Sequence, residues 1–233
     1  MPAYFEMSLQ FRREDLYPGF IADFDAALDR AGVKFDSGCW EDRGLSQGEI
    51  TAWNQKKLDQ DFELHDDFLE WGSNAGDYKQ SFYHFENYTK VRGFWINRYP
   101  SRDEFSFTLI IPEGEIFRWV PGDKQGEELF QKGLPAGFYQ PVIRAEAAEK
   151  LLTLSQTLWQ FPAVRTVQTM MELSDAATSL EDLRAGSLPT ACPFAILEPG
   201  LPAFPELSAK TLTEGRPGLL LLEIDMLPPD FPG

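Results

Sequence analysis

The sequence predicts an α+β protein in which helices pack on one face of an antiparallel sheet. Several segments alternate apolar and polar residues, which is typical of strands with one buried face. Other segments carry apolar residues at helical spacing. Because the strands predicted between residues 80 and 119 follow one another through short turns, we expect them to pair antiparallel.

The first 35 residues predict a strand, a helix and the start of a returning strand. Over residues 3–12 the apolar side chains occupy alternate positions, at Phe5, Met7, Leu9 and Phe11. Pro18 begins a helix over residues 18–31, and Gly32 suits its end because glycine readily adopts a left-handed conformation. Residues 33–35 then begin the next strand.

Residues 36–77 interrupt this pattern with a mainly helical insertion. Ser46 and Glu49 have the spacing of a capping box, so a helix is expected to begin near Gln47. From Leu58 to Trp71, helical spacing competes with a short alternating stretch, and we favour the helix.

Residues 80–119 predict a meander of antiparallel strands. The clearest strand carries four alternating apolar residues, Phe105, Phe107, Leu109 and Ile111. Two further strands are expected before it, at residues 81–88 and 91–96, with a hairpin loop at residues 99–103. A turn at residues 112–114 leads into a short strand at residues 116–120.

The second half of the chain adds more helices and strands. A helix over residues 142–160 has five apolar residues on one face, Ile143, Ala147, Leu151, Leu154 and Leu158. A strand at residues 164–171 follows, and Ser174 is expected to cap a small helix over residues 175–183. A short helix is also expected at residues 128–132, within a loop-rich stretch.

These elements predict one α+β domain over residues 1–187, with the acidic insertion at residues 36–77. Residues 188–233 hold 9 of the 17 prolines. They are expected to form an extension that ends in a strand, residues 219–226, packed on the same domain. One possible core is ferredoxin-like β-α-β-β-α-β, with strands near 4–11, within 80–111 and at 164–171, and helices at 18–31 and 142–160.

The charge of the chain excludes some classes of partner. The 37 acidic and 21 basic residues give a net charge of −16. We therefore expect no nucleic acid and no anionic membrane as a partner, because both attract Lys and Arg. Half of the excess lies in residues 36–77, which hold 11 acids and 3 bases.

Signatures of cofactor chemistry are missing from the sequence. No glycine-rich phosphate loop and no nucleophile elbow is present, so no cofactor is expected. Cys39 and Cys192 are the only cysteines and are expected to be thiols in a reducing compartment, with one long-range disulfide as the alternative. The first residues have no basic and apolar leader pattern, which favours a cytoplasmic location.

The two histidines, His65 and His84, are the candidate ligands for a metal site. In an extended chain, Glu63, His65 and Asp67 would share a face, and His84 with Glu86 could join them from a neighbouring strand. The spacing matches no known ligand motif, and acidic residues beside a histidine are common in an acidic chain. We therefore predict no metal and expect the histidines among solvated carboxylates.

The leading hypothesis is a non-catalytic cytoplasmic protein that binds a basic protein partner. Aromatic rings within an acidic field suit such a surface, because rings supply buried anchors and charge speeds encounter. An immunity or antitoxin-like inhibitor has this character. The predicted partner-binding residues are Trp40, Trp53, Asp61, Glu63, Asp66, Asp67 and Trp71.

Two alternatives stand beside this hypothesis. The first is that the insertion is an ordinary amphipathic segment, with its rings in the core and its acids in water. The second is a hydrolase that uses carboxylates, with or without a metal at His65 and His84. The sequence alone nominates no catalytic pair among the 37 carboxylates.

Overall fold

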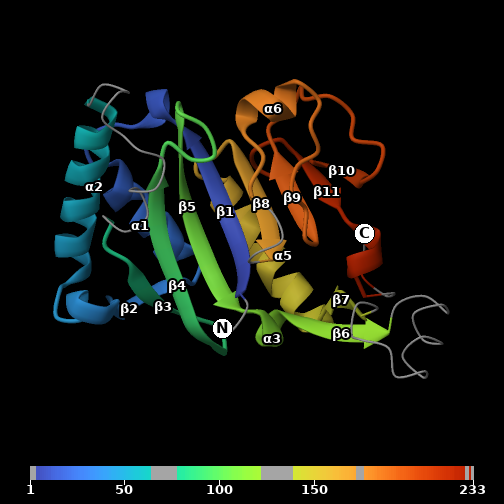
Figure 1. The fold of residues 1–233 in the computed structure, drawn as a ribbon, viewed down its shortest axis with the longest axis horizontal. Coiled ribbons are helices and arrows are strands. Elements are labelled where there is room, and N and C mark those ends of the chain that lie inside the picture. The colour runs from blue at the N-terminus through green and yellow to red at the C-terminus, as the bar shows by residue number, and fades with distance from the viewer. Residues whose placement is uncertain (1–3, 64–77, 122–138, 172–175, 229–230, 232–233) are drawn as a thin grey trace.

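A computed structural model describes residues 4–63, 78–121, 139–171, 176–228 and 231. It shows a mixed α+β protein with a large antiparallel sheet and five α-helices within those residues. The nine strands of the sheet run in the order β10-β11-β9-β8-β1-β5-β4-β3-β2, and a separate two-stranded sheet joins β6 to β7 (Figure 1). The predicted fold class is confirmed at this level.

The first three elements follow the sequence patterns. They are β1 (Tyr4–Arg12), α1 (Phe20–Arg30) and β2 (Lys34–Gly38). The helix begins at Phe20 instead of Pro18, because Gly19 before it adopts a left-handed conformation with φ of 92°. A one-turn 3-10 helix, η1 (Arg13–Asp15), follows β1, and another, η2 (Trp40–Asp42), follows β2.

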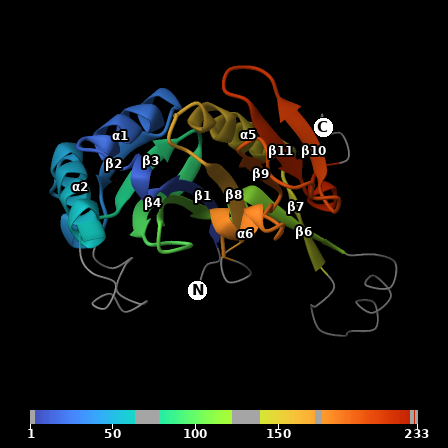
Figure 2. The same ribbon diagram turned by 90° about the horizontal axis from the view of Figure 1, so that it is seen from above.

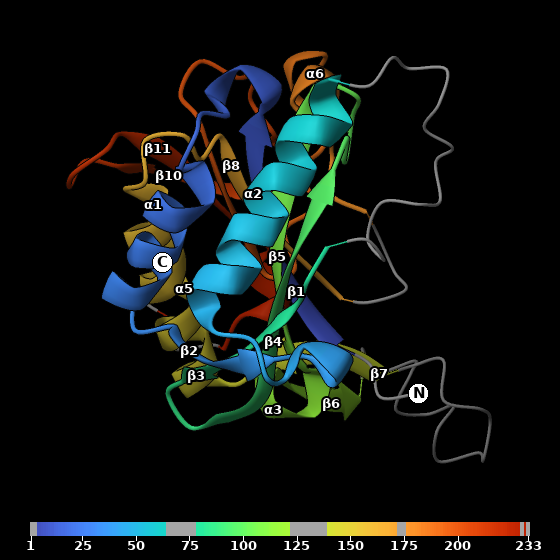
Figure 3. The same ribbon diagram turned by 90° about the vertical axis from the view of Figure 1, so that its left-hand side faces the viewer.

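The predicted capping box begins the second helix, α2 (Gln47–Glu63). The carboxylate of Glu49 accepts hydrogen bonds from the Ser46 backbone N–H (2.8 Å) and hydroxyl (2.7 Å). The helix therefore begins where the spacing predicted. It continues past Leu58 to Glu63, and the rest of the predicted stretch to Trp71 lies outside the described residues. Figure 3 shows α2 beside α1, at the β2 end of the sheet.

The predicted meander is confirmed as β3 (Ser81–Phe85), β4 (Tyr88–Asn97) and β5 (Glu104–Pro112). The stretch predicted as one strand over residues 81–88 is divided, because Glu86 turns the chain with φ of 53°. After β5 a short helix, α3 (Glu113–Ile116), occupies the predicted turn and leads into β6 (Phe117–Pro121).

The next elements differ from prediction at their starts. Ile143 ends a strand, β7 (Tyr139–Ile143), and the long helix α5 begins only at the next residue but one (Ala145–Trp159). After β8 (Thr166–Met171), the small helix α6 covers Leu180–Arg184. Ser179 caps it, since its side chain accepts from the Asp182 N–H (3.0 Å), so the helix begins later than the predicted residue 175. The predicted cap residue, Ser174, lies outside the described residues. The helix predicted at residues 128–132 lies outside the described residues.

The C-terminal residues contribute three strands to the sheet. These are β9 (Phe194–Leu197), β10 (Ser208–Leu212) and β11 (Gly218–Leu222), and a 3-10 turn, η4, follows at Ile224–Met226. The predicted strand over residues 219–226 therefore ends early. The strands β9 and β10 were not predicted, because each is short and lies among prolines and turn residues.

The two faces of the sheet have different partners. The face that carries the alternate apolar residues of β1 packs against α1 and α5, and α6 lies on the other side (Figure 2). Helices on a single face are therefore not confirmed. Phe11 is fully buried, with five ring centroids within 5.1–6.4 Å: Phe20, Phe24, Trp95, Phe105 and Phe161.

Among the described residues, none of the helices combines the length and the apolar character that crossing a membrane requires.

Candidate functional site

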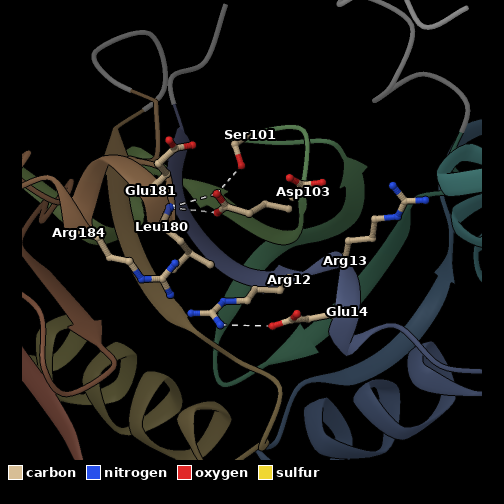
Figure 4. A pocket seen from close by; sticks show the side chains of 9 residues that line it. Arg12, Arg13, Glu14, Ser101, Asp103, Leu180, Glu181 and Arg184 are labelled. Atoms are coloured by element: carbon tan, nitrogen blue, oxygen red, sulfur yellow. Dashed lines mark hydrogen bonds and ion pairs between the residues drawn. The ribbon is translucent and has the colours of Figure 1, made fainter. Parts of the chain in front are cut away.

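A pocket of about 660 Å³ lies where β1 ends and β5 begins (Figure 4). Arg12 at the end of β1 and Arg13 and Glu14 in η1 form part of its wall. The turn between β4 and β5 contributes Ser101 and Asp103. The remaining lining residues are Glu104 of β5 and three residues of α6, Leu180, Glu181 and Arg184.

Glu104 is the buried charge of this pocket and connects two of its walls. The residue is only 3% exposed. The two carboxylate oxygens accept from the Leu180 backbone N–H at 3.1 and 3.3 Å, and the Ser101 hydroxyl donates to one of them at 2.5 Å. Burial raises the pKa of Glu104 above its ordinary value. The carboxylate therefore ties α6 to the β4–β5 turn.

A second candidate site is an exposed aromatic surface on η2 and α2. Trp40 is 61% exposed and Trp53 is 51% exposed, although tryptophan is usually largely buried. Asp42 forms an ion pair with Lys79, and the Lys79 ammonium lies 4.8 Å from the Trp53 ring centroid. These contacts connect α2 to η2, the 3-10 turn that also carries Trp40. We call Trp40, Glu41, Asp42 and Trp53 the indole surface.

Each ring of the indole surface already has a cation against it. The Arg92 guanidinium lies 5.3 Å from the Trp40 ring centroid, as Lys79 does for Trp53. Cations are attracted to the negative face of an aromatic ring. Each of the two tryptophan residues is nevertheless more than half exposed. The surface can therefore take further cations on ring area that its own side chains leave open.

The other predicted partner-binding residues are not all part of this surface. Asp61 is 2% exposed, and its carboxylate accepts from Lys57 (2.8 Å), Tyr78 (2.7 Å) and Asn97 (2.9 Å). It is directed inward, because it is buried and one of its donors, Asn97, belongs to β4 of the sheet. Glu63 is the last residue of α2. Three further residues, Asp66, Asp67 and Trp71, lie outside the described residues.

His84, Cys39 and Cys192, which the structure describes, belong to no metal or disulfide site among the described residues. His84 is exposed, with its Nε2 3.0 Å from an oxygen of Asp36, and His65 lies outside the described residues. In the part of the chain that the structure describes, no three His, Cys, Asp or Glu side chains are grouped to hold a metal. Cys39 and Cys192 do not form a disulfide. Burial raises the pKa of the Cys39 thiol to about 11, so it is protonated at neutral pH.

The pocket residues were missed by sequence reasoning. They come from residues 12–14, 101–104 and 180–184, and no spacing in the chain connects these segments. The one available signal was a set of arginines in an acidic chain, which is too common to identify a pocket.

Comparison with known proteins adds no family to these observations. No protein-family model, no curated protein and no solved structure matches this chain.

Proposed function

We propose that this chain is a non-catalytic binding protein whose indole surface takes a basic protein partner. The observation that carries the proposal is the exposure of Trp40 and Trp53 on adjoining elements. Large exposed rings are typical anchors of protein interfaces. Lysine and arginine from a partner would meet the same rings that Lys79 and Arg92 already contact.

The charge around the indole surface supports a basic partner. Asp36, Glu41 and Glu49 are exposed nearby in the chain, and residues 36–77 carry half of the net charge of −16. A field of one sign accelerates the approach of a partner of the opposite sign and opposes partners of like sign.

An immunity or antitoxin-like inhibitor is the class of binding protein that we favour. Such an inhibitor would cover a basic nuclease surface with carboxylates that take the place of phosphates. This class rests on the charge and the exposed rings, and it carries with it the proposal of a cytoplasmic location. The ferredoxin-like core likewise stays a prediction.

Titration with an arginine nonapeptide tests the indole surface directly. We expect the wild-type protein to bind the peptide, and the double variant Trp40→Ala/Trp53→Ala to bind it at least fivefold more weakly. The reason is that two cation–π contacts, each contributing about 0.5–1 kcal/mol, would be lost. Isothermal titration calorimetry at low salt measures both dissociation constants.

Trp119 supplies the matched control for this titration. It lies on β6 and is 52% exposed, close to the exposure of Trp53. Trp119→Ala should leave peptide binding unchanged. An equal loss in the Trp119 variant, or full binding by the double variant, would reject the indole surface. A large fall in melting temperature of the double variant would instead show that the rings stabilise the fold.

A hydrolase that uses carboxylates is the second proposal, and the pocket favours it to a lesser degree. Glu14, Asp103, Glu104 and Glu181 surround one space, and a buried carboxyl with a raised pKa is a common feature of catalytic acids. Both oxygens of Glu104 are nevertheless occupied by Leu180 and Ser101. Because these hydrogen bonds give Glu104 a structural role, the binding protein is our first proposal.

A further inference from the structure

The pocket at the end of β1 is separate from the indole surface and has its own chemistry. Of the nine residues that line it, Leu180 is the one large apolar residue. The volume of about 660 Å³ is within the usual range of small-molecule sites. A polar wall of this kind suits a small polar ligand better than a lipid or an apolar ring.

One side of the pocket holds two converging guanidinium groups. Arg12 and Arg184 both donate to the same oxygen of Glu198, at 2.9 and 2.8 Å. A third guanidinium, that of Arg165, lies 3.8 Å from the other oxygen of Glu198. Glu198 therefore accepts from both Arg12 and Arg184, while Arg165 is held mainly by Asp15, whose two oxygens accept from it at 2.9 and 2.5 Å.

The two guanidinium groups keep donors for a ligand. A guanidinium has five N–H donors in a planar fork that matches a carboxylate. The Arg184 side chain is 48% exposed, and its bond to Glu198 uses one nitrogen. Arg12 makes one further bond, to Glu14, at a long 3.3 Å.

The other side of the pocket carries two acids, with Arg13 beyond them. Figure 4 shows the carboxylates of Asp103 and Glu181 across from Arg12 and Arg184. Both acidic residues are exposed, and neither forms an ion pair with another described residue. This side offers carboxylate acceptors to a cation, and the arginine side offers guanidinium donors to an anion.

We propose that this pocket binds a small zwitterion, either a free amino acid or a short peptide. The ligand carboxylate would lie on Arg12 and Arg184, where a charge-assisted fork is available. The ligand ammonium would lie at Asp103 and Glu181. This arrangement satisfies both sides of the pocket at once, which no ligand of a single charge does.

The test compares ligands that differ in one charge. The probes are free alanine and the dipeptides Ala-Ala, Ala-Glu, Ala-Lys and Ala-Phe, each titrated into the whole protein by calorimetry. At least one is expected to bind. The N-acetylated and the C-amidated forms of that probe, which lack the ammonium and the carboxylate respectively, should each bind about tenfold more weakly. Comparing the affinity for alanine with the affinities for the dipeptides shows whether the ligand is an amino acid or a peptide.

Variants locate the binding at the pocket. Arg184→Gln and Glu181→Gln should each weaken the binding probe about tenfold, because each removes one charged partner. Both side chains lie on the surface of α6, so folding should persist, and circular dichroism checks it. The matched controls are Arg30→Gln and Glu206→Gln, at exposed positions away from the pocket, and they should bind as the wild type does.

Three results would overturn the proposal. The first is that none of the five probes binds at millimolar concentration. The second is that a blocked probe binds as tightly as its zwitterionic parent. The third is that Arg184→Gln and Glu181→Gln bind as the controls do. None of these outcomes depends on the arginine nonapeptide, so the proposals for this pocket and for the indole surface are tested independently.

Discussion

Asp25 is a single residue whose partly buried carboxyl makes stability depend on pH. It lies on α1, and the Thr51 hydroxyl of α2 donates to it. Burial raises its pKa from the ordinary 3.8 to about 6, against the lowering effect of the Thr51 bond. The folded state therefore holds this proton more tightly than the unfolded state does. Lowering the pH from about 6 to 4 should add stability through this group.

Asp25→Asn removes the buried charge and should raise the melting temperature at pH 8. The gain should shrink towards zero as the pH falls from about 6 to 4, because the wild-type carboxyl then becomes protonated as well. The size of the Asp25 pKa shift limits the gain in the free energy of unfolding to about 3 kcal/mol. Calorimetric melting across this range measures it, with Asp29→Asn, at an exposed position of the same helix, as the control. A gain that does not change with pH would contradict the assignment.

At the scale of elements, Asp61 holds the end of α2 to the sheet. Asp61→Ala would remove the carboxylate that accepts from the Tyr78 hydroxyl and the Asn97 amide, two residues that are 3% and 0% exposed. We expect a loss of about 3 kcal/mol in the free energy of unfolding, since buried unsatisfied donors are costly. Urea denaturation measures the loss.

Asp59→Ala is the control for this measurement. Asp59 lies on the same helix and accepts one bond from Gln55 (3.0 Å) in a partly exposed position. Its loss should cost well under half as much. Equal effects of the two variants would show that Asp61 is an ordinary surface acid, as the sequence led us to expect.

Some elements could be predicted from the sequence because one local signal decides them. Alternation identified β1 and β5, and the Ser46–Glu49 capping box identified the first residue of α2. The sequence signal for a helix cap was ambiguous before α6, because Ser174 and Ser179 each lie one or two residues before an acidic residue. Short strands such as β9 have too few residues to show a period.

The candidate sites depend on tertiary structure to different degrees. The indole surface was partly predictable, since Trp40 and Trp53 lie close in the chain and in an acidic segment. The inward direction of the Asp61 side chain could not be predicted, because it depends on hydrogen-bond donors from Tyr78 and from β4. The pocket was not predictable, because strand register and the position of α6 bring its walls together.

For the whole molecule, the net charge of −16 should act against the compact state. Salt screens such repulsion, with a Debye length of about 30 Å at 0.01 M and about 8 Å at 0.15 M ionic strength. We therefore expect the melting temperature to rise as NaCl increases across this range. A fall would mean that the surface ion pairs, such as Arg165 with Asp15, outweigh the repulsion.

The repulsion should also be local, because residues 36–77 carry half of the charge excess. The double variant Asp36→Asn/Glu41→Gln removes two exposed acids from this segment, and Asp23→Asn/Glu149→Gln removes two exposed acids from elsewhere. The first variant should show the smaller rise of melting temperature with salt, since it relieves the more crowded charges. Equal salt responses would show that the repulsion is spread over the molecule. In that case the acidic segment would offer a basic partner no stronger field than the rest of the surface.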